Sequence, residues 1–175
     1  MKKLCYGLLL LLSLKAQAQE NITFKKPTSE ILALADFIRP PQIKMSSDNK
    51  WMLFTYRSTY KSLEELGQEE MKLAGLRINP RTNMESSTVF YNKIGLKKIG
   101  EQLEETVFVG MPENPSLSNF AFSPDNNRLA FTNTNESGTA LFVLDLTTRT
   151  AKQLTAYNLN ATLMLLFNGW AVQHD

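Results

Sequence analysis

The stretch FAFSPDNNRLAFTNTNESGTALFVLDLTTRTAKQLT, residues 120–155, decides how this chain folds. Apolar residues alternate with smaller or polar ones on both sides of Ser123-Pro124-Asp125, which is the pattern of two half-buried strands joined by a tight turn. Proline presets the backbone of such a turn, and the aspartate can accept a hydrogen bond from the amide two residues on. ALFVLDLTT follows as a third strand, and AKQLT as a fourth at the outer edge. The stretch therefore predicts a four-stranded antiparallel sheet.

The same pattern occurs earlier in the chain. IKMSSDNKWMLFT, residues 43–55, aligns without a gap with residues 120–132, which lie 77 positions later. GLRINPRTN then resembles LDLTTRTAK, and STVFYNKIGLKKI supplies a further strand. A repeated unit of four antiparallel strands describes the blade of a β-propeller. We therefore expect an all-β fold, a partial propeller of about two four-stranded blades, at residues 43–110 and 111–160. The identical pairs are Ser46 and Ser123, Asp48 and Asp125, Asn49 and Asn126, Phe54 and Phe131, and Thr55 and Thr132.

The first unit contains an insertion, YKSLEELGQEEMKLAG, at residues 60–75. Its charged, helix-prone composition predicts a short helical excursion. This excursion accounts for a spacing of 77 where propeller repeats usually measure about 40 to 50 residues. The glutamates of the insertion fit a solvated surface face. A carboxylate patch that recognises a cationic group is the alternative interpretation.

The first 18 residues have the organisation of a signal peptide. Lys2 and Lys3 precede a short apolar run, and Ala16-Gln17-Ala18 is an A-x-A cleavage site. We expect cleavage between Ala18 and Gln19, and export to the periplasm or the medium. Residues 19–42 follow as a linker or short helix, in which apolar residues recur at helical spacing until Pro40-Pro41 ends the pattern.

Composition argues against several kinds of site. Removal of the three lysines of residues 1–18 leaves 16 basic against 17 acidic residues, a balance of −1, so no basic surface favours nucleic acid. Cys5 is the one cysteine and His174 the one histidine, which makes a zinc site implausible. Cys5 precedes the apolar run, so we expect no lipid anchor. No phosphate-binding glycine motif is present. We therefore expect no cofactor, no metal site and no cofactor-binding residue.

Three further features were weighed as sites. Asp48, Asp125 and Asp145 lie at turns or strand ends, and calcium there would need six or more oxygen ligands. Asn135-Glu136-Ser137 and the segment beginning at Asn160 fit the N-glycosylation pattern, which we interpret as incidental.

Two segments together resemble a known family. Residues 27–80, which contain ILALADFIRPP and EEMKLAGLRINP, are similar to the start of exported bacterial serine peptidases of the prolyl oligopeptidase family, on the branch of glutamyl endopeptidases and dipeptidyl or acylaminoacyl peptidases. The stretch at 120–155 resembles the propeller repeat of those peptidases and of periplasmic TolB-type propellers. The resemblance covers about residues 27–160. It implies an N-terminal propeller that restricts peptide access to a C-terminal α/β-hydrolase domain with a Ser-Asp-His triad.

The catalytic part of that family has no counterpart here. G-x-S-x-G, the motif of the nucleophile elbow, does not occur, and His174 is the penultimate residue, where chains usually fray. We therefore expect no catalytic residue and no activity of this chain alone. Residues 161–175 include an apolar run without alternation, which we interpret as an aberrant tail from a truncated or frame-shifted gene, with a genuine short variant as the competing interpretation.

Two functions follow as hypotheses. The first is the substrate-gating propeller of an exported serine peptidase that acts on peptides. The second is a small exported TolB-like binding module. Two blades cannot close a propeller ring, and the apolar faces and strand edges that they leave open favour self-association.

Overall fold

The computed structural model describes residues 25–102 and 107–162, in two compact units that divide after Asp36. The described part of the first unit contains helix α2, Ser29–Ala35. The amide of Leu32 donates to the carbonyl of Thr28 at 3.0 Å, and the amide of Asp36 closes the helix on the carbonyl of Leu32 at 2.8 Å. Of the two alternatives for residues 19–42, a linker or a short helix, the described part ahead of Pro40-Pro41 contains the short helix.

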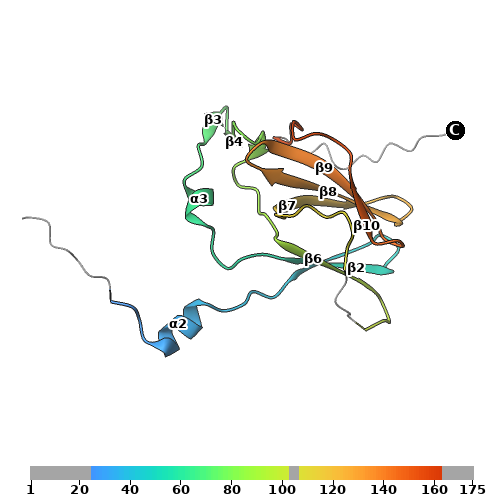
Figure 1. Ribbon diagram of the computed structural model, residues 1–175, viewed down its shortest axis with the longest axis horizontal. Helices are drawn as coiled ribbons and strands as arrows, with labels where there is room; N and C mark the ends of the chain where they lie inside the picture. The colour runs from blue at the N-terminus through green and yellow to red at the C-terminus, as the bar shows by residue number, and fades with distance from the viewer. Residues whose placement is uncertain (1–24, 103–106, 163–175) are drawn as a thin grey trace, which may run out of the picture. The chain divides into compact units, whose positions relative to one another are not determined.

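Four antiparallel strands of the second unit form its largest sheet, in the order β10-β9-β8-β7 (Figure 1). They are β7 (Leu117–Phe122), β8 (Arg128–Asn135), β9 (Gly138–Asp145) and β10 (Thr150–Gln153). The prediction from residues 120–155 is confirmed, including the place of AKQLT at the edge. A register shift between Ser118 and Ala121 interrupts the β7–β8 ladder, where Asn119 has a positive φ of 54°.

A three-stranded sheet, in the order β1-β2-β6, is built by the first repeat. Its strands are β1 (Gln42–Met45), β2 (Trp51–Tyr56) and β6 (Lys93–Lys98), all antiparallel. β1 ends at Met45 and β7 ends at Phe122, so the two repeats enter their turns at the same aligned position.

The expectation of a fourth strand in the first sheet is wrong. GLRIN forms β4 (Leu76–Asn79), which lies in a separate sheet between β3 (Met71–Leu73) and β5 (Met84–Glu85). The reason is local, because the end of the insertion folds back on GLRIN as a hairpin and takes its pairing groups. The helix of the insertion, α3, is confined to Leu63–Leu66. The described residues are thus mostly β, in three antiparallel sheets.

The main hydrophobic core joins the first and largest sheets. Leu53 of β2 and Leu96 of β6 lie in one buried cluster with Leu129, Phe131 and Phe142 of β8 and β9. The other face of the first sheet is less covered, and Ile43 of β1 is 54% exposed.

The first repeat turn is held by a compact set of hydrogen bonds. Ser46 N donates to the carbonyl of Trp51 at 3.0 Å, and Trp51 N donates to Ser46 Oγ at 2.9 Å. Ser46 Oγ donates in turn to Asp48 Oδ1 at 2.6 Å. Asn49 N donates to the carbonyl of Ser46 at 3.0 Å, and Asn49 adopts a φ of 57°.

The second turn uses the aligned atoms in the same way. Ser123 N donates to the carbonyl of Arg128 and Arg128 N to Ser123 Oγ, both at 2.9 Å. Ser123 Oγ donates to Asp125 Oδ1 at 2.5 Å, and Asn126 N donates to the carbonyl of Ser123 at 2.9 Å. Asn126 has a φ of 56°. The repeat seen in the sequence is therefore also a repeat of local structure.

The two repeats are also bonded to each other. Asn126 Oδ1 accepts hydrogen bonds from Ser47 N at 3.2 Å and from Ser47 Oγ at 3.0 Å. Tyr91 and Leu117 exchange both backbone hydrogen bonds at 2.8 Å, just ahead of β6 and at the start of β7. The turns and strands of the two repeats thus fix one another at two separate places.

Candidate functional site

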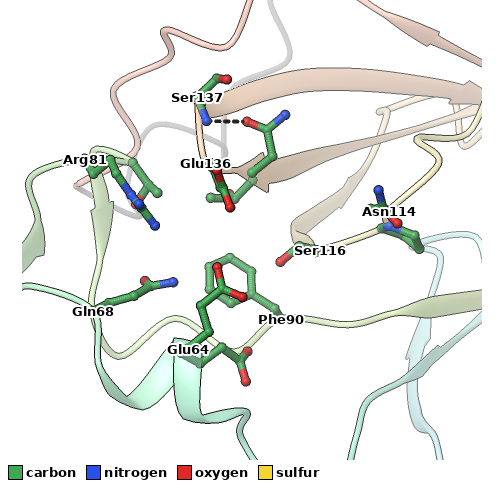
Figure 2. Close-up of a pocket in the computed structure, with 13 residues that line it drawn as sticks. Glu64, Gln68, Arg81, Phe90, Asn114, Ser116, Glu136 and Ser137 are labelled. Carbon is green, nitrogen blue, oxygen red and sulfur yellow. Dashed lines mark hydrogen bonds between the residues drawn. The ribbon is translucent and has the colours of Figure 1, made fainter.

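The second unit contains a cavity of about 680 Å³ between the insertion and the β8–β9 hairpin (Figure 2). Four chain segments far apart in the sequence supply its walls. Its lining residues are Glu64, Glu65, Gln68, Arg81, Thr82, Phe90, Asn114, Pro115, Ser116, Thr134, Asn135, Glu136 and Ser137.

The wall made by the insertion depends on α3. Ser62 Oγ accepts a hydrogen bond from Glu65 N at 3.1 Å, and Glu65 Oε2 accepts one from Ser62 N at 2.8 Å, which completes a capping box. Gln68 Oε1 then accepts a hydrogen bond from Asn79 Nδ2 at 2.6 Å. This contact connects the middle of the insertion, just after α3, to β4.

The opposite wall is the turn between β8 and β9. Asn135 Oδ1 accepts a hydrogen bond from Ser137 N at 2.8 Å, drawn as a dashed line in Figure 2. Thr139 Oγ1, one residue into β9, donates to the carbonyl of Thr82 at 3.0 Å. Ser116, which lines a third wall of the cavity, is held in place by the hydrogen bond that its amide donates to Asn133 Oδ1 at 2.8 Å.

Charged side chains of both signs reach the cavity. Glu64, Glu136 and Arg81 are exposed, and among the described residues none of these three side chains has a hydrogen bond or ion pair. Carboxylates outnumber the guanidinium, and the half-buried ring of Phe90 lies among them (Figure 2). The lining is therefore able to hold a polar chain that offers hydrogen-bond donors.

The residues that line this cavity do not include the histidine of a serine-peptidase triad. A serine nucleophile needs a base within hydrogen-bond reach and a third group that orients the base. Ser116 and Ser137 line the cavity, but its lining contains neither histidine nor cysteine. His174 lies outside the described residues.

The three aspartates weighed for calcium serve separate turns. Asp145 Oδ1 accepts from Thr147 N at 3.0 Å and from Thr148 N at 2.8 Å, and these bonds, that to Thr148 foremost, hold the pKa of Asp145 below its usual value. The Ser46 hydroxyl lowers the pKa of Asp48 in the same manner. Within residues 25–102 and 107–162, no three His, Cys, Asp or Glu residues come together as a metal site.

The insertion's glutamates divide between two roles. Glu64 and Glu65 line the cavity, whereas Glu70 contacts Arg77, whose Nη2 donates to Glu70 Oε2 at 2.7 Å. Sequence reasoning gave Glu136 only as part of a glycosylation pattern and did not single out Arg81. No periodicity in the sequence connects these residues, because the cavity forms only when the hairpins pack.

Other predicted features lie beyond the described residues, namely the signal peptide of residues 1–18 and most of the tail of residues 161–175. No helix among the described residues has the length and apolar character needed to cross a membrane.

Two plant proteins are similar to this chain. The protein named probable glutamyl endopeptidase, chloroplastic, from Arabidopsis thaliana is 29% identical over 139 residues, and the protein of the same name from Oryza sativa subsp. japonica is 32% identical over 111 residues. The matches cover 75% and 62% of this chain but only 14% and 12% of those proteins. No family model and no solved structure matches the chain.

Proposed function

We propose that this chain is a non-catalytic propeller-type module of an exported peptidase system, which restricts and positions peptides for a separate hydrolase domain. In this proposal the first and largest sheets are neighbouring blades, and the third sheet is an excursion from the first blade. Glutamyl endopeptidases are the related class. The proposal includes export through the predicted signal peptide.

One observation carries the proposal, namely the repeated turn with its aligned hydrogen bonds on two sheets that share a core. Stacked sheets of repeated topology are the building principle of propellers. The similarity to two proteins named as glutamyl endopeptidases supports the peptidase connection. The cavity lined by Glu64, Arg81 and Glu136 supplies charged and polar groups that a bound peptide could contact.

The non-catalytic part of the proposal is tested by active-site labelling. The purified full chain is incubated with a fluorophosphonate probe, which reacts with activated serines, and with a peptide that contains glutamate. We expect neither labelling nor hydrolysis. A labelled serine, together with turnover that survives repurification, would overturn this part.

The gating part needs a catalytic partner. The matched 139-residue segment of the Arabidopsis protein is replaced by the corresponding segment of this chain, and cleavage of a short glutamyl peptide is compared with cleavage of a folded protein. We expect the peptide to be cut and the folded protein to be spared. A folded chimera that cuts both equally, where the parent protein spares the folded one, would refute gating by this module.

A further inference from the structure

The β3–β4 hairpin has an open edge. β3 pairs only with β4 within the described residues, and the two strands are joined at Ala74-Gly75, whose φ values of 47° and 89° define a two-residue hairpin turn. Figure 1 shows β3 on the side of the hairpin away from β8 and β9. An open edge of this kind can accept another strand.

The register of the hairpin fixes which backbone groups this edge presents. Leu73 and Leu76 flank the turn and therefore exchange both backbone hydrogen bonds, so Lys72 and Arg77 form a pair without backbone bonds. The carbonyl of Arg77 accepts from Ser86 N at 2.8 Å, on the side away from β3. The amide and carbonyl of Lys72 accordingly point outward, and the same alternation, continued one residue beyond the start of β3, gives that direction to those of Glu70.

Charge on this edge is self-complementary. Lys72 lies directly across from Arg77, so two positive charges are paired within the hairpin. Arg77 forms an ion pair with Glu70. The contact with Arg77 lowers the pKa of Glu70, which keeps this carboxylate ionised. Lys72 has no ion pair within the described residues. Glu70 and Lys72 flank Met71 symmetrically, one residue on each side.

We propose that β3 is a homodimerisation edge, which pairs antiparallel with β3 of a second copy of this chain around a two-fold axis at Met71. In this register Glu70 of each copy lies opposite Lys72 of the other. Each such pair exchanges two backbone hydrogen bonds and sets opposite charges side by side. The contact is short, so the dimer is weak and forms at high protein concentration.

Register-specific crosslinking tests the proposal. In an otherwise cysteine-free full chain (Cys5→Ser), Met71→Cys places two thiols at directly opposed positions without backbone bonds, with Cα atoms about 4.5 Å apart. Leu73→Cys is the matched control, because Leu73 is 57% exposed and Met71 49% exposed. In the proposed dimer the Cα atoms of residue 73 in the two copies would lie about 13 Å apart, too far for a disulfide.

Under mild oxidation we expect Met71→Cys to form a disulfide-linked dimer while Leu73→Cys remains monomeric. Equal crosslinking of both variants, or of neither, overturns the proposal.

A charge exchange provides an independent measurement by sedimentation velocity. Lys72→Glu and Glu70→Lys should each self-associate about tenfold more weakly than the parent chain, because like charges then face each other. A mixture of the two variants should form a heterodimer, since both cross-strand pairs become complementary, and this outcome also shows that both variants fold.

Lys152→Glu, on β10, serves as the control and should self-associate as the parent does. A mixture that associates no better than its components refutes the proposed register. If Lys152→Glu weakened self-association as much as Lys72→Glu does, the contact between copies would lie on a different edge and the proposal would be refuted.

Discussion

Phe131 and Phe54 occupy aligned positions of the repeated motif, yet we expect their replacement by leucine to have very different effects. Phe131 is fully buried, and its ring centroid lies 5.6 Å from that of Phe142 and 6.0 Å from that of Phe120. Phe54 is half-buried on the sparsely covered face of the first sheet, beside the exposed Ile43. The difference between the two substitutions therefore measures how unequally the two sheets are covered.

The magnitude follows from the contacts that each substitution removes. Two aromatic pairs contribute about 0.5–1.5 kcal/mol each, so Phe131→Leu should lower the free energy of unfolding by about 2 kcal/mol, with a small cavity added. Phe54→Leu loses partly exposed apolar area only and should cost less than about 1 kcal/mol.

Urea unfolding of the full chain, followed by tryptophan fluorescence with equal slopes for all variants, measures both values. An equal loss for the two variants, or a larger loss for Phe54→Leu, would show that the first sheet's outer face is covered in solution, against the structure.

Three further outcomes are expected. Ser123→Ala removes the acceptor of the Arg128 amide inside a buried turn and should cost about 1–2 kcal/mol in urea unfolding, whereas Ser123→Thr should retain part of the stability. The Ser123 hydroxyl lowers the pKa of Asp125 in the folded chain. The ionised aspartate therefore stabilises the fold at pH values above its unfolded pKa of about 3.9. This contribution is lost as the pH falls through the lower pKa of the folded state. The urea midpoint of Asp125→Asn should therefore lie below that of the parent at pH 7 and approach it as the pH falls below about 3.9 and through the lowered folded pKa. Gly138→Ala should lower the melting temperature, since its Cβ would lie 2.4 Å from the Tyr157 carbonyl oxygen at a φ of 132°, and an unchanged melting temperature would contradict the turn as described.

The largest sheet was predictable because each of its strands carries its own signal. Alternation in residues 120–132 gives β7 and β8, and Ser123-Pro124-Asp125 gives the turn between them. These signals are local, and local backbone chemistry decides hairpins of this kind. The edge position of β10 followed from the order of the strands along the chain.

The third sheet was not predictable from the repeat. The alignment of GLRINPRTN with LDLTTRTAK assigned it to the first sheet, although its partner lies only a few residues upstream, across Ala74-Gly75. The two-residue turn at Ala74-Gly75 lets Met71–Leu73 pair with Leu76–Asn79 close by in the chain, and this local pairing prevailed over the long-range similarity. The short helix predicted in the insertion is present, although α3 covers only Leu63–Leu66 and is too short to persist without its capping box.

The candidate cavity was the least predictable feature. Glu64 and Glu136 are 72 residues apart, and they line one cavity only because the insertion reaches the β8–β9 turn. Each residue alone resembles an ordinary solvent-exposed glutamate, so single-residue chemistry does not identify the site.

The two repeat turns contribute different groups to the contact between them: the first turn donates the hydrogen bonds and the second turn accepts them. Asn126 uses its side-chain oxygen to hold both the amide and the hydroxyl of Ser47, in the preceding turn. The residue aligned with Ser47 is Pro124, which has neither an amide hydrogen nor a hydroxyl. An asparagine side chain of a later turn could not accept these two hydrogen bonds from Pro124. It could make only an apolar contact with the proline ring. The serine-to-proline exchange thus makes the two repeat turns non-interchangeable in this contact.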